Sequence, residues 1–93
     1  MNKTKKLLQY ILEQYTIALT NGVGIMAFYE AKAEIESELG LDRQVSNPEL
    51  IRELNQFTAQ VRGLIQKSYD IDQILEKQKG QILIIAETLY QNK

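Results

Sequence analysis

The stretch SNPELIRELNQFTAQVRGLIQKSY, residues 46–69, decides the fold of this chain. Its apolar side chains recur every three or four residues, which places them along one side of a helix with 3.6 residues per turn. They are Leu50, Leu54, Phe57, Val61, Leu64 and Ile65, followed by Ser68. The other side is polar and carries Glu49, Arg52, Asn55, Gln56, Gln60, Arg62 and Gln66. Because such a stripe is not stable alone in water, it predicts partner helices.

Two segments before this stretch carry similar stripes. In the first, from about residue 5 to 20, the stripe consists of Leu8, Ile11, Leu12, Tyr15, Ala18 and Leu19. In the second, residues 25–39, it consists of Phe28, Ala31, Ile35 and Leu39, widened by Met26 and Ala27. The charged residues Glu30, Lys32, Glu34, Glu36 and Glu38 are expected to make its exposed sides acidic. Both segments therefore predict amphipathic helices.

A fourth helix is expected over residues 71–90. Its stripe consists of Ile71, Ile74, Leu75, Ile82, Ile85, Ala86 and Leu89. Gly80 interrupts the pattern, and residues 81–85 are rich enough in β-branched side chains to form a strand instead. We prefer the helix, because the stripe continues on both sides of Gly80 and no partner strand is visible in the sequence.

Local signals mark the helix ends. Asn21-Gly22 and Gly40 stand where left-handed residues end helices, and Leu41 is placed to fold back on Ile35. The pairs Ser46 with Glu49 and Asp70 with Gln73 have the spacing of a capping box. Val45 and Leu50 have the positions of a hydrophobic staple, and Pro48 suits a first helical turn. These signals predict one domain over residues 1–93, an all-α, antiparallel up-down four-helix bundle with helices at about 5–20, 25–39, 47–69 and 71–90.

Composition excludes several classes of function. The 93 residues carry a net charge of -1, which gives no general attraction to nucleic acid. Cysteine and histidine are absent, which removes thiolate ligands and the commonest general base and metal ligand. We therefore expect no enzyme, no catalytic residues, no cofactor and no metal site. With no signal peptide and no membrane-spanning segment recognised, the expected location is cytoplasmic, with at most peripheral membrane association.

Three short motifs have ordinary explanations. Gly22-Val23-Gly24 follows a helix and lacks the rest of a phosphate-binding loop, so we interpret it as a corner. Glu30, Glu34 and Glu38 have the spacing to approach one cation, but a solvated acidic face is the favoured interpretation. The lysines at positions 3, 5 and 6 are interpreted mainly as a solvated terminus, with contact to the inner membrane surface as the alternative.

The predicted partner-binding residues lie in or near the fourth helix. They are Tyr69, Lys77, Gly80, Leu83, Ile84 and Tyr90. Leu83 and Ile84 lie off the main stripe beside Gly80, so they would form an exposed apolar notch suited to a protein partner. The alternative is that neighbouring helices or a second copy of the chain bury this side as well. Tyrosines near helix ends are either half-buried edges of the bundle or anchors for a partner.

Three stretches resemble a known family. They are IESEL at residues 35–39, NPELIREL at 47–54 and DQILEK at 72–77, within a helical layout that covers roughly residues 7–90. This pattern resembles the immunity proteins of pediocin-like bacteriocins, the family that includes the enterocin A immunity protein. The resemblance implies a cytosolic four-helix bundle without enzymatic activity, from a Gram-positive bacterium.

The resemblance also implies a partner. Such proteins protect the producing cell by acting on the complex between the bacteriocin and its receptor, a mannose phosphotransferase permease in the membrane. Specificity would lie in the C-terminal half, here the turn at 68–72, the outer face of the fourth helix and the tail. The alternative function is a small helical adaptor or regulator that acts through homodimerisation or by binding a partner helix. The expected oligomeric state is a monomer or a weak homodimer.

Overall fold

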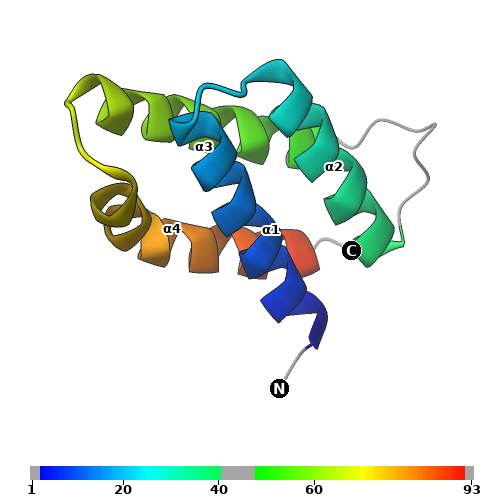
Figure 1. The fold of residues 1–93 in the computed structure, drawn as a ribbon. Coiled ribbons are helices and arrows are strands. Elements are labelled where there is room, and N and C mark those ends of the chain that lie inside the picture. Colours follow the sequence, from blue (N-terminus) through cyan, green and yellow to red (C-terminus); the bar gives the residue numbers. More distant parts are fainter. Residues whose placement is uncertain (1–2, 41–47, 92–93) are drawn as a thin grey trace.

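The computed structural model describes residues 3–40 and 48–91, which form four helices (Figure 1). The helices are α1 (Lys3–Thr20), α2 (Ile25–Leu39), α3 (Pro48–Gln66) and α4 (Ile71–Gln91). They form an antiparallel up-down bundle, which confirms the predicted fold class. The segment 81–85 lies within α4, so the helical interpretation of this segment is correct and the strand alternative is wrong.

Helix α1 is the centre of the bundle. It packs against each of the other three helices, most extensively against α4 and α2, whereas α2 and α4 scarcely touch each other. In Figure 1, α1 and α2 form one hairpin, and α3 and α4 form a second hairpin that crosses it. The core forms where the two hairpins meet.

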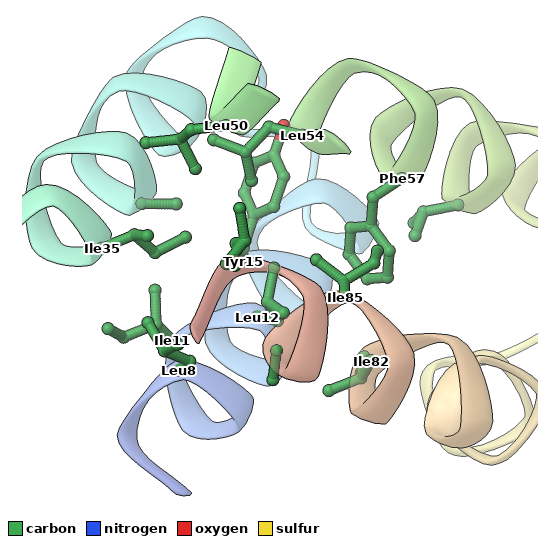
Figure 2. Packing of buried hydrophobic residues seen from close by; sticks show 14 of the residues in the cluster. Leu8, Ile11, Leu12, Tyr15, Ile35, Leu50, Leu54, Phe57, Ile82 and Ile85 are labelled. Carbon is green, nitrogen blue, oxygen red and sulfur yellow. The ribbon is translucent and has the colours of Figure 1, made fainter. Parts of the chain in front are cut away.

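Most residues of the predicted apolar stripes form the core, but Ile71 and Leu75 of the α4 stripe lie outside it, and Ser68 at the end of the α3 stripe is exposed. Figure 2 shows side chains from all four helices converging on one another, among them Leu12 of α1, Ile35 of α2, Phe57 of α3 and Ile85 of α4. These side chains are almost completely removed from water. Burying each large apolar side chain stabilises the fold by about 1.5–3 kcal/mol, so the four stripes together drive folding.

Helix ends follow local rules where the sequence carries glycine or a capping pair. Gly22 and Gly40 are left-handed, with φ of 85° and 70°, and they end α1 and α2 as predicted. At the start of α4, the backbone N–H of Gln73 donates to Asp70 Oδ1 and the backbone N–H of Asp70 donates to Gln73 Oε1, both at 2.9 Å. This reciprocal pair is the predicted capping box.

Helix α3 ends earlier than expected. It stops at Gln66 rather than at residue 69, because Ser68 adopts a left-handed backbone with φ of 66°. The N–H of Ser68 donates to the carbonyl of Ile65 at 2.9 Å, and that of Tyr69 donates to the carbonyl of Leu64 at 3.4 Å. These are the two hydrogen bonds of a Schellman motif, here built on serine instead of glycine.

Two other expectations on α2 are wrong. Met26 does not widen the core stripe, because Ala27 takes the inward position and leaves Met26 69% exposed. Glu36 is not on an exposed side: its side chain is 2% exposed and accepts a hydrogen bond from Lys32 Nζ at 2.9 Å. Paired in this way, the buried carboxylate retains a compensating charge. The expected contacts of Leu41, Val45 and Ser46 lie outside the described residues.

A buried polar contact joins α1 to α3. The hydroxyl of Thr58 donates to the carbonyl of Leu54 at 2.6 Å, so the hydroxyl of Tyr15 is the donor in its hydrogen bond to Thr58 Oγ1. Burial raises the pKa of the Tyr15 phenol, while the charge of Arg62 opposes this rise. The folded state therefore holds the phenol proton more tightly than the unfolded chain does.

The left-handed serine gives a first prediction. Ser68→Gly should raise the free energy of unfolding by up to about 1 kcal/mol, because a left-handed backbone disfavours any residue with a Cβ. Urea denaturation followed by circular dichroism measures the change. Ser37→Gly, within the last turn of α2, is the matched control, and its free energy of unfolding should fall by roughly 0.5 kcal/mol. Equal losses in both variants would contradict the proposed strain at Ser68.

The Tyr15 phenol gives a second prediction. Its contribution to stability is complete below the ordinary tyrosine pKa of about 10 and is lost as the pH rises through the raised pKa. The free energy of unfolding should therefore fall in alkaline solution, and Tyr15→Phe should reduce this fall. Denaturation at a series of pH values from neutral to strongly alkaline measures it. Tyr10→Phe, which changes an exposed ring, should retain the wild-type profile, and an unchanged profile in Tyr15→Phe would contradict the assignment.

Candidate functional site

The outer side of α4 carries an apolar patch. Leu83 and Ile84 are 49% and 59% exposed, and the position of a Cβ on Gly80 would meet no atom within 4 Å. These three residues, named here the α4 outer patch, lie three and four positions apart and therefore share one face of the helix. The side of α4 that faces the core carries Ile74, Ile82 and other buried residues. In the single chain, the notch predicted from the sequence is therefore open to solvent.

A groove between α1 and α4 reaches this patch. It has a volume of about 410 Å³, and Leu83 lines it at the edge of the patch. Its remaining lining residues are Gln9, Glu13, Asp72, Leu75, Glu76, Lys79 and Ile82. The apolar members come from α4, whereas three carboxylates and one ammonium surround them. The groove can therefore receive an apolar side chain, and it disfavours an anionic one.

An ion pair links α1 and α4 on the side of the groove. Lys5 Nζ donates to Glu87 Oε2 at 2.6 Å. The hydrogen bond from Lys5, followed by its charge, lowers the pKa of the Glu87 carboxyl. Both side chains are partly exposed, so salt screens their attraction. One of the three N-terminal lysines thus has a structural role between two helices.

The other predicted residues of α4 lie apart from the α4 outer patch. The Lys77 ammonium lies 4.7 Å from the centroid of the Tyr69 ring, a cation–π contact beside the turn into α4. Tyr69 and Tyr90 are half-buried and pack against the core. The structure therefore brings Gly80, Leu83 and Ile84 together, pairs Tyr69 with Lys77, and leaves Tyr90 near the far end of the helix.

A second apolar surface was not predicted from the sequence. Val23, Ile25, Met26 and Tyr29 are exposed at and just after the corner between α1 and α2. We name these four residues the hairpin tip. Its signal was present in the sequence, because no charged residue occurs from position 14 to 29. It was not predicted because Met26 was assigned to the core stripe of the second helix and Ile25 was taken only as the first residue of that helix.

Other kinds of site find little support in the described residues. Within residues 3–40 and 48–91, no three carboxylate, imidazole or thiol side chains form a group that would hold a metal ion. None of the four helices is both long enough and apolar enough to cross a membrane. The most prominent surface features of the described residues are the exposed apolar side chains next to a groove.

Comparison with known proteins adds no relative. The chain matches no family model, no curated protein and no solved structure.

The exposure of Leu83 gives a third prediction. Leu83→Asp should change the free energy of unfolding by less than about 1 kcal/mol, because nearly half of the side chain already contacts water. Ile82→Ala, at the neighbouring buried position, should cost about 2–5 kcal/mol. Thermal or urea denaturation of the two variants tests the pair. A large loss in Leu83→Asp would mean that this face is covered in solution, as in a homodimer.

Proposed function

We propose that this chain is a bacteriocin immunity protein of the pediocin-like type. In this role it binds other proteins without catalysis and protects the cell that makes the bacteriocin. It acts from the cytosol on the complex between the bacteriocin and its membrane receptor, a mannose phosphotransferase permease. The proposal takes its direction from the resemblance in residues 35–39, 47–54 and 72–77.

The α4 outer patch is the observation that carries this proposal. The apolar side chains of Leu83 and Ile84 are exposed to solvent, and they lie on the helix that the resemblance associates with specificity. Small exposed apolar clusters beside a groove are the usual anchors of a protein interface. The four-helix architecture agrees with the resemblance, but a bundle hosts many functions, so the surface and not the fold supports the proposal.

The geometry also indicates how a partner would bind. A partner side chain that enters the α1–α4 groove would contact Leu75, Ile82 and Leu83, while a second contact would cover Ile84 beside Gly80. Because Gly80 has no side chain, the backbone of α4 can be approached closely at this point. Glu13, Asp72 and Glu76 at the groove would select against a strongly anionic partner surface.

A resistance assay tests the proposed function. Expression of the wild-type chain in a sensitive Gram-positive strain should raise the inhibitory concentration of one member of a panel of pediocin-like bacteriocins. The double variant Leu83→Asp/Ile84→Asp should lose most of this protection at equal protein level, because both apolar anchors become charged. Tyr10→Asp is the matched control, since Tyr10 is as exposed as Ile84 but lies on α1.

Two outcomes of this assay contradict different parts of the proposal. If the wild-type chain blunts no bacteriocin of a broad panel, the immunity function is wrong. If it protects and the double variant protects equally well, the function stands and the α4 outer patch is the wrong surface. Circular dichroism of the purified variants checks that both remain folded.

The second candidate function is a small helical adaptor or regulator that pairs through α4. The exposure of Leu83 and Ile84 in the single chain also fits a homodimer or a bound partner helix. A stable dimer buries about 800 Å² on each partner, and two side chains and a groove supply only part of that area. Sedimentation over a wide concentration range distinguishes the candidates, because a strictly monomeric chain excludes the homodimeric adaptor.

A further inference from the structure

The hairpin tip exposes more apolar side chains than any other described corner of the bundle. Ile25 is 74% exposed, and Met26 and Tyr29 are 69% and 63% exposed. Figure 1 shows that the corner between α1 and α2 lies at the opposite end of α1 from the N-terminus. Side chains exposed to this extent protrude from the molecule. A protruding apolar corner is suited to inserting into an apolar environment such as the interior of a lipid layer.

Charge is absent from the hairpin tip. A quarter of all residues in the chain are charged, yet none occurs between Glu13 and Glu30. Glu30 follows Met26 by four residues, so the first acidic side chain lies one helical turn further from the corner. An apolar corner of this kind can therefore be buried to a depth of about one turn without burying a carboxylate.

A cation lies beside the hairpin tip. Arg62 of α3 reaches Gly24, where its Nη2 atom lies 3.3 Å from the position that a Cβ would occupy. Together with Ile25, Phe28 and Tyr29, Arg62 lines a pocket of about 260 Å³. Within the described part of the chain, Arg62 forms no ion pair, so its guanidinium is available to an external anion.

We propose that the hairpin tip docks the protein onto an anionic phospholipid membrane. Val23, Ile25 and Met26 enter the boundary between head groups and acyl chains, and the ring of Tyr29 lies at the level of the head groups. The guanidinium of Arg62 binds lipid phosphate next to the corner. The charge pattern favours this orientation, because the α1–α4 groove carries three carboxylates against one ammonium, and an anionic surface would repel this net negative charge.

The tip is a different attachment point from the N-terminal lysines. Helix α1 has 18 residues and is therefore about 27 Å long, with Lys3 and Lys6 at one end and the corner at the other. Attachment through the tip directs this corner toward the lipid and leaves the α4 outer patch uncovered. The inference does not depend on the immunity function, because it concerns lipid alone.

Tryptophan fluorescence tests the docking surface directly, since the chain contains no tryptophan. Met26→Trp should show a blue-shifted emission with vesicles of phosphatidylglycerol and phosphatidylcholine, and brominated acyl chains should quench it. Tyr10→Trp, at an exposed position of α1 outside the tip, is the matched probe and should show neither effect. Circular dichroism without vesicles verifies that both variants keep the wild-type fold.

Co-sedimentation with the same vesicles measures the strength of binding. Ile25→Ser/Met26→Ser should lower the partition coefficient about tenfold or more, because two apolar side chains no longer enter the interface. Arg62→Gln should lower it roughly fivefold, with a weaker dependence on salt. Lys3→Gln/Lys6→Gln should change it less than either variant does.

Three results would overturn the proposal. The first is equal sedimentation of the wild type and of Ile25→Ser/Met26→Ser, and the second is no vesicle binding by the wild type. The third is loss of binding in Lys3→Gln/Lys6→Gln with the tip variants unaffected, which would assign the contact to the N-terminal end. None of these results bears on resistance to a bacteriocin, so the two proposals fail separately.

Discussion

One helix, α1, has to pack against the three other helices at the same time. Helix α1 contacts α2, α3 and α4, so its buried residues cover a broad arc rather than a narrow seam. Even Thr16 lies inside this arc, where its hydroxyl donates to the carbonyl of Leu12 at 2.8 Å. Because α1 fills the middle, the outer faces of the peripheral helices have no partner within the chain. The exposed apolar side chains of α4 and of the hairpin tip are a consequence of this arrangement.

Polar groups inside the bundle are matched rather than avoided. Tyr15 bonds to Thr58, Glu36 pairs with Lys32, and Gln78 Nε2 donates to Gln60 Oε1 at 3.2 Å. No buried side-chain nitrogen or oxygen in the described residues lacks a hydrogen bond. Two of these contacts join different helices, so they favour one register of α1 and α4 against α3 over others that would leave a polar group unpaired.

The sequence predicted those features that depend on neighbours along the chain. The four stripes, the left-handed Gly22 and Gly40, and the Asp70–Gln73 capping box all follow from residues a few positions apart. Features set by packing were harder to foresee. Ser68 adopts a backbone normally reserved for glycine, so nothing in its identity marked the end of α3. Ala27 faces the inside of α2 and Met26 does not, although both are apolar and adjacent, so residue type alone did not distinguish them.

The same distinction between features set by neighbouring residues and features set by packing applies to the candidate site. Helical spacing sufficed to place Leu83 and Ile84 off the main stripe, but whether water covers them depends on which helices flank α4. The hairpin tip was overlooked because an apolar residue at the start of a helix gives no indication of the side it faces. The long uncharged interval around Gly22 and Gly24 was the available clue.

The pairing of α1 with α4 has a consequence for how the protein is made. The ion pair between Lys5 and Glu87 joins residues 82 positions apart, and the two helices share an extensive packed surface. During synthesis, the buried face of α1 therefore cannot be fully covered until α4 has been made. Until then, apolar side chains of α1 remain exposed on the nascent chain, where the ribosome and its chaperones can contact them. The bundle closes only after translation has passed its last helix.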